Sequence, residues 1–137
     1  MDRRRRFSAF IASGRDPRST IIQALQFARD FLPESCLDER SRVKATIIVE
    51  ELVSNSLHYG AAGNDLSLWL SLEDKGDAIV IELEDDGVEF DPTCATSFDG
   101  PDPKTGGGIG LALVRAWGED LTYSRRSERN HLKLMIR

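Results

Sequence analysis

Cysteine is scarce in this sequence, and its scarcity excludes several classes of small protein. Only Cys36 and Cys94 are present, far apart and without His or Cys at ligand spacing nearby, which argues against a structural zinc site and a disulfide framework. Long apolar runs are also absent: no segment approaches the roughly 20 residues that cross a bilayer. No secretion signal follows the basic residues Arg3–Arg6. We therefore expect a cytoplasmic protein without a membrane span.

Basic residues are too few to indicate nucleic acid as a direct partner. The chain has 18 Lys and Arg against 23 Asp and Glu, a formal net charge of −5, whereas duplex binding draws on basic side chains that neutralise phosphates. The run Arg3–Arg6 is a local exception, and we interpret residues 1–6 as a flexible, solvated basic tail. With 137 residues and no internal repeat, the chain is expected to form one domain over residues 1–137.

Hydrophobic periodicity divides the chain into helices and strands. Helices are expected at about 18–32, 38–59 and 109–117, and strands at 7–12, 66–72, 79–84, 120–125 and 131–136. Asp38 fits the N-cap of the second helix, and Gly60 is its expected C-terminal stop. The stretch between Asp85 and Gly110 has little periodicity and is long for a connection in so compact a domain. We expect that stretch to be functional or disordered.

Four polar side chains share one face of the second expected helix. With steps of about 100° per residue, Ser54, Asn55 and His58 fall close to Glu51 on the helical wheel. The apolar face that should meet the core is formed by Ala45, Ile48, Val49, Leu52 and Val53. A carboxylate and a carboxamide one turn apart suit a magnesium nucleotide, because the amide oxygen is a hard metal ligand and the carboxylate accepts a proton. The alternative is that these residues form an ordinary polar edge of the helix, exposed to solvent.

Two glycine-containing loops are the other candidate nucleotide contacts. Asp85-Asp86-Gly87 follows a strand, where the carboxylate can accept a hydrogen bond from an amine such as that of adenine; a plain turn is the alternative. The second loop reads Gly106, Gly107, Gly108, Ile109, Gly110 and Leu111. It precedes an expected helix, so its amides and the positive helix end form an anion site for phosphates. A hinge without a ligand is the alternative reading.

In order along the chain, these segments resemble the asparagine box and the two glycine boxes of the GHKL ATPases. That superfamily includes gyrase, chaperones, histidine kinases and mismatch-repair proteins. The small size, the absence of a helical hairpin with a phospho-accepting histidine, and the segment Asp86–Pro92 are most similar to the stand-alone anti-sigma-factor serine/threonine kinases. The resemblance covers nearly the whole chain and is weakest before Asp38.

The resemblance implies a fold and a set of roles for the residues. The fold is an α+β two-layer sandwich of the Bergerat type, with a mixed, mostly antiparallel sheet and helices on one face. Asn55 would coordinate Mg²⁺, Asp85 would recognise adenine, and Glu51 would be the general base. Residues 92–104 would form a lid. The remaining nucleotide contacts would come from His58, Tyr59, Gly87, Gly106, Gly107, Gly108, Ile109, Gly110 and Leu111.

The leading functional hypothesis is a Mg-ATP-dependent serine/threonine protein kinase that acts as an anti-sigma factor in a partner-switching system. Its partners would be an anti-sigma-factor antagonist and a sigma factor, and the family resemblance also suggests a homodimer. One alternative is a binding module in which ATP controls partner affinity without catalysis. The other is a dissociated histidine-kinase catalytic domain, which His58 and Tyr59 favour.

Three residues or positions depart from the pattern of the family. Glu89 stands where the first glycine box often has a glycine, so its side chain is expected to point away from the phosphates. His58 and Tyr59 follow the histidine-kinase arrangement, and a phosphate contact by His58 would depend on pH. The last strand lacks the threonine that many members place near the phosphates. Nucleotide binding tolerates these differences more readily than kinase activity does.

Overall fold

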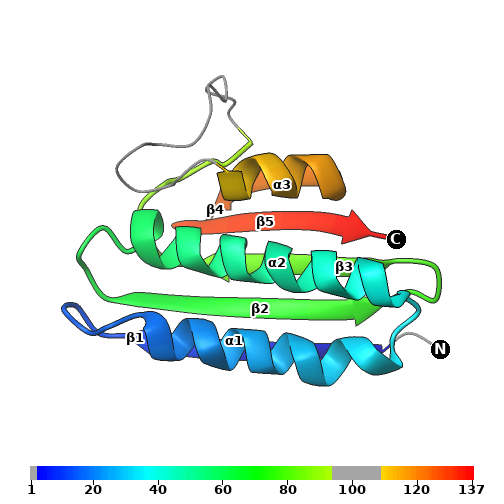
Figure 1. Ribbon diagram of the computed structural model, residues 1–137. Helices are drawn as coiled ribbons and strands as arrows, with labels where there is room; N and C mark the ends of the chain where they lie inside the picture. The colour runs from blue at the N-terminus through cyan, green and yellow to red at the C-terminus, as the bar shows by residue number, and fades with distance from the viewer. Residues whose placement is uncertain (1–2, 94–108) are drawn as a thin grey trace.

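The computed structural model describes residues 3–93 and 109–137, and the structural statements that follow concern these residues (Figure 1). The strands are β1 (Arg3–Ile11), β2 (Leu66–Asp74), β3 (Ile79–Asp85), β4 (Glu119–Arg126) and β5 (Arg129–Ile136). The helices are α1 (Arg18–Phe31), α2 (Glu39–Asn55) and α3 (Ile109–Trp117), with a short 3₁₀ turn at Leu32–Glu34 and a π-helical turn at Ser56–Gly60. None of the helices in the described residues is long and apolar enough to cross a membrane.

The five strands form one sheet in the order β1-β2-β3-β5-β4, and each neighbouring pair is antiparallel. The expected two-layer α+β architecture is confirmed, since α1, α2 and α3 lie on one face of this sheet (Figure 1). The expectation of a mixed sheet is wrong for the described strands. Short turns join β2 to β3 and β4 to β5, and a tight turn between sheet neighbours makes the pair antiparallel.

The core lies between the helices and the inner face of the sheet. On β2 the alternating residues Leu66, Leu68, Leu70 and Leu72 are all buried, as period-two patterning predicts for a half-buried strand. The five residues expected on the apolar face of α2 are also buried. Ile81, at the centre of β3, pairs with Leu72 on one side and Leu134 on the other. The helices therefore pack on a continuous apolar layer.

The first turn of α2 is capped as the sequence indicates. Asp38 has an extended backbone and accepts a hydrogen bond at Oδ1 from Ser41 N at 2.8 Å. That bond lowers the pKa of the Asp38 carboxyl. The other end differs from expectation, because α-helical geometry stops at Asn55 and the chain continues as the π-helical turn, whose last residue is Gly60. Such turns are frequent at functional sites.

The interpretation of residues 1–6 as a flexible tail is wrong for Arg3–Arg6. These residues are the first part of β1 and pair with Ser71–Asp74 of β2. The Arg3 guanidinium lies 4.1 Å from the centre of the Phe31 ring, donates to the Phe31 carbonyl and contacts Glu34 at 3.5 Å. Long arginine stems cover apolar surface while the charged ends stay wet, so a basic run is compatible with an edge strand.

We predict that Ile81→Ala lowers the free energy of unfolding by about 2–5 kcal/mol, because it removes a buried side chain from the centre of the sheet. Urea denaturation of the purified chain measures the change. Ile22→Ala is the matched control, since Ile22 is 65% exposed on α1, and its effect should stay within about 0.5 kcal/mol. Equal losses for the two variants would contradict the assignment of the core.

Candidate functional site

A pocket opens where the C-terminal end of α2 meets the ends of β3 and β5. It is lined by Leu52, Asn55, Ser56, Leu83, Asp85, Phe90, Pro92, Tyr123, Asn130 and Leu132. Aliphatic and aromatic side chains make up part of this lining, and Asn55, Ser56, Asp85 and Asn130 contribute polar groups to it. A mostly apolar pocket with a few convergent polar groups is the usual form of a small-molecule site.

Asp85 is the buried carboxylate of this pocket. It is the last residue of β3 and is 6% exposed. Its Oδ2 accepts a hydrogen bond from Ser56 Oγ, and its Oδ1 accepts from Gly87 N at 3.0 Å and from Asn130 Nδ2 at 2.9 Å. The four residues come from three separate segments of the chain. A buried carboxylate needs such donors, and these three fix its orientation.

Gly87 is required by a close approach of two backbone segments. A Cβ atom at Gly87 would lie 2.2 Å from the Gly60 carbonyl oxygen, and that oxygen accepts a hydrogen bond from Val88 N at 2.9 Å. Gly60 itself lies against Asp85, whose Oδ1 would be 3.3 Å from an added Cβ. The π-helical turn thus brings the end of α2 onto the loop after β3, beside the pocket.

Asn55 contributes an amide with a buried, unpaired donor. It lines the pocket, and its Nδ2 is buried without a hydrogen-bond partner among the described residues. An unpaired buried polar group costs free energy, so a ligand that hydrogen-bonds this amide would remove that cost. The oxygen and nitrogen of an amide are interchangeable by a flip. The side chain therefore fits either a metal ligand or a phosphate donor.

A divalent cation at this site would depend on the nucleotide for most of its ligands. The described residues contain no group of three or more His, Cys, Asp or Glu side chains placed to hold a metal ion. Magnesium often keeps several waters and binds through one or two protein oxygens together with substrate phosphates. The chemistry of Asn55 is consistent with that arrangement.

Glu51 lies one turn before Asn55 and faces the start of α3. A Cβ atom at Gly110 would lie 1.7 Å from Glu51 Oε2, so a larger residue there would displace this carboxylate from its present position. Burial raises the pKa of the Glu51 carboxyl, and the neighbouring charge of Glu50 adds to the increase. A carboxylate with a raised pKa is a stronger proton acceptor. Glu51 is not among the residues that line the pocket.

His58 and Tyr59 lie on the π-helical turn, outside the pocket lining. Both are exposed, and their rings meet edge to face with centres 4.7 Å apart. Tyr59 also stacks on Phe90 at 5.0 Å, and Phe90 lines the pocket. The structure therefore connects Tyr59 to the pocket through a second ring, while His58 lies one ring further away.

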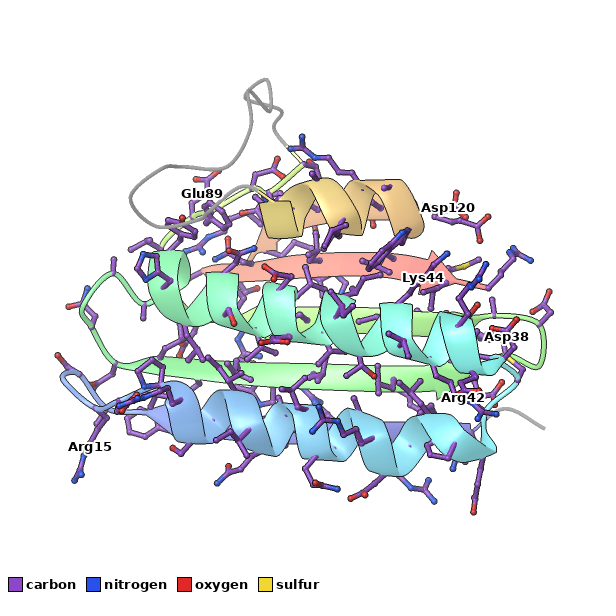
Figure 2. All side chains as sticks on the ribbon, viewed as in Figure 1. Arg15, Asp38, Arg42, Lys44, Glu89 and Asp120 are labelled. Carbon is purple, nitrogen blue, oxygen red and sulfur yellow. The ribbon has the colours of Figure 1, made fainter. Side chains whose placement is uncertain are left out.

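The second glycine loop falls largely outside the described residues. This applies to Gly106, Gly107 and Gly108, and to most of the expected lid at residues 92–104. Ile109, Gly110 and Leu111 open α3 as expected, and their phosphate contacts stay a prediction. Glu89 is exposed, and Figure 2 shows it at the end of the molecule opposite Asp38 and Arg42.

Of the residues that line the pocket, the sequence predicted nucleotide contacts only for Asn55 and Asp85 and placed Pro92 in the expected lid. The polar residues that it missed are Ser56, Tyr123 and Asn130. A signal for Asn130 was present, because Leu132, Leu134 and Ile136 alternate inward and residue 130 continues that series. A polar residue at an inward position of a strand needs a partner. The identity of that partner depended on strand pairing, which places Asn130 opposite Asp85.

Two comparisons with known proteins agree with this geometry. The family model of the histidine kinase-like ATPase domain matches residues 15–136. A serine/threonine-protein kinase of Bordetella bronchiseptica, BtrW, is 31% identical over 123 residues, which cover 85% of this chain and 84% of that protein.

We predict that Glu51→Gln raises the melting temperature at pH 8 and that this gain shrinks as the pH falls. A carboxyl with a raised folded pKa stabilises the fold when protonated, below the unfolded value near 4.5, and loses that contribution as the pH rises through the folded pKa. Thermal melts from pH 4 to pH 8 measure the difference. Glu128→Gln, at an exposed turn residue, is the control. A pH-independent difference for Glu51→Gln would contradict the burial of this charge.

Proposed function

The chain belongs to the histidine kinase-like ATPase domain family, and we propose that within this ATP-binding family it is a Mg-ATP-dependent serine/threonine protein kinase. The observation that carries the proposal is the pocket in which buried Asp85 and the unpaired amide of Asn55 face the same space. Adenine offers a donor-only amine to the first group, and a magnesium phosphate suits the second. The printed name of the Bordetella relative supports serine or threonine as the acceptor.

Most of the binding site would position the nucleotide. Asp85 would hold the adenine, the aliphatic wall of Leu52, Leu83 and Leu132 would contact its faces, and Asn55 would bind the magnesium ion. Gly106, Gly107, Gly108, Ile109, Gly110 and Leu111 would surround the phosphates at the start of α3. When bound, ATP would supply the phosphoryl group, and its magnesium ion would offset the negative charge of the phosphates. Phosphoryl transfer requires little more than this alignment and charge stabilisation.

Glu51 would act on the acceptor hydroxyl. Its carboxylate lies beside Gly110 at the first turn of α3, next to the expected phosphate site, and its raised pKa makes it a better base. In this role it would take the proton of the serine or threonine hydroxyl as that oxygen forms a bond to the γ-phosphorus of ATP, while the bond from this phosphorus to ADP breaks and ADP leaves. The burial that raises the pKa thus supports the catalytic role as well.

We further propose, from the family resemblance, that the chain phosphorylates an anti-sigma-factor antagonist and otherwise sequesters a sigma factor. It would act as a homodimer in the cytoplasm. A module that binds ATP without catalysis would share the pocket but would not need Glu51. A histidine kinase would share both, and the chemistry of the phosphorylated product separates it from a serine kinase.

We expect wild-type protein to bind ATP with magnesium, and Asp85→Asn to bind about 10- to 100-fold more weakly. The loss is that of a hydrogen bond to a charged acceptor. Isothermal titration calorimetry measures both dissociation constants. Asp86→Asn is the matched control, because Asp86 is exposed and lies outside the pocket lining. Equal affinities for wild type and Asp85→Asn, or no binding by either, would reject the nucleotide assignment.

We expect wild-type protein to transfer labelled phosphate from ATP to a co-purified partner. Glu51→Gln should transfer it at least about 100-fold more slowly, which is the lower end of the rate contribution of a general base. Glu39→Gln is the control, since Glu39 is an exposed residue at the opposite end of α2. Label that survives acid indicates phosphoserine or phosphothreonine, whereas acid-labile label indicates the histidine kinase. Unchanged transfer by Glu51→Gln would remove Glu51 from the catalytic role.

A further inference from the structure

We propose that Asn130 is the residue that gives the pocket its preference for a 6-aminopurine over a 6-oxopurine. It would do so by holding the Asp85 carboxylate with one acceptor position directed at the base. The inference rests on the proposed ATP-binding function and extends it. Asn130 belongs to β5, lies 45 residues from Asp85 in sequence and is 5% exposed.

The hydrogen bonds to Asp85 leave room for one more donor. A carboxylate has about four lone-pair positions. Among the described residues, Gly87 N and Asn130 Nδ2 reach Oδ1, and Ser56 Oγ reaches Oδ2. One position on Oδ2 is left for a ligand. An amine at position 6 of a purine fills it, whereas a carbonyl oxygen would face a second acceptor.

The orientation of the Asn130 amide is determined by its four partners. Nδ2 donates to Asp85 Oδ1 at 2.9 Å and to the Val88 carbonyl at 2.7 Å. Oδ1 accepts from Phe90 N at 3.2 Å and from Tyr123 Oη at 2.5 Å. A flipped amide would place its oxygen against two acceptors, Asp85 Oδ1 and the Val88 carbonyl, and its nitrogen against the N–H donor of Phe90. The amide is therefore held in one orientation, with all its hydrogen-bonding capacity used.

Tyr123 makes that orientation insensitive to ordinary changes in pH. Burial raises the pKa of the Tyr123 phenol above its usual value, and the nearby charge of Glu89 contributes. The hydroxyl therefore stays protonated at neutral pH and continues to donate to Asn130. Together, these contacts join β4, β5 and the loop after β3 around the carboxylate that meets the base.

The same amide also connects base recognition to the pocket wall. Val88 and Phe90, whose backbone groups Asn130 binds, flank Glu89 in the loop after β3. Phe90 lines the pocket, and its ring stacks on Tyr59. Loss of the amide would therefore free both the carboxylate and the loop that carries the aromatic wall. Asn130 acts on the base through Asp85 and is a positioning residue.

The test compares ATP with inosine triphosphate, whose base carries an oxygen in place of the 6-amine and a proton on N1. Calorimetry with magnesium is carried out on the full chain for wild type, Asn130→Asp and Asn130→Ala. We expect wild type to bind ATP about 10- to 100-fold more tightly than inosine triphosphate, and both variants to retain less than about a threefold preference. Asn64→Asp adds the same charge at an exposed residue outside the pocket lining and should keep the wild-type ratio.

The ratio of the two affinities separates recognition from a purely structural role. A folded Asn130 variant that binds both nucleotides more weakly but keeps the wild-type ratio would overturn the inference, while leaving ATP binding in place. A wild type that binds neither nucleotide would overturn the proposed function and this inference with it. Circular dichroism identifies the folded variants.

Nuclear magnetic resonance of labelled wild-type protein gives a second measurement that does not depend on a variant folding. The side-chain amide protons of Asn130 should shift more on addition of ATP than of inosine triphosphate, since only ATP carries the 6-amine that the open position on Asp85 is proposed to accept from. Equal shifts with the two nucleotides would count against the inference.

Discussion

The site depends on one contact, the approach of the end of α2 to the end of β3. Gly60 and Gly87 meet there with no space for a side chain between them, and the Gly60 carbonyl accepts a hydrogen bond from Val88 N. Ser56, in the same π-helical turn, donates to Asp85. The contact fixes a helix against a strand at the point where the pocket opens. A nucleotide that contacts both Asn55 and Asp85 therefore depends on this contact, because it holds the end of α2 at a fixed position relative to the end of β3.

The rest of the fold keeps this contact in place by ordinary burial. α2 has its apolar face on the sheet and lies between α1 and α3 (Figure 1), while Asp38 caps its first turn. The free energy that positions the site therefore comes mainly from buried apolar residues, of which Leu52 also lines the pocket. The polar groups of the pocket then serve orientation, because most of them satisfy one another. Among the described residues, the Asn55 amide nitrogen has no hydrogen-bond partner and Asp85 Oδ2 accepts only from Ser56, which is why these two groups indicate where a ligand would bind.

Much of the fold was predictable because it follows from local patterns. The alternation on β2, the apolar face of α2 and the turn between β2 and β3 each depend on residues close in sequence. The prediction of a tail at Arg3–Arg6 was wrong because charge was considered without the pairing that β2 provides. The π-helical turn was missed because its bond from Ala61 N to the Ser56 carbonyl has no distinctive residue type. Asn55, Asp85 and Glu51 were proposed as site residues from their spacing and from the family resemblance, whereas the position of Asn130 beside Asp85 required the strand register.

The arginines of β1 also affect how the sheet meets other molecules. β1 is an edge strand, so one side of its backbone has amide and carbonyl groups that no strand of the described chain pairs with. Exposed edges of this kind promote aggregation between chains, and charged side chains oppose it. Arg4, Arg5 and Arg6 are exposed in succession along this edge. Two copies that paired along this edge in register would bring these cations together, so the basic run opposes pairing between the exposed edges.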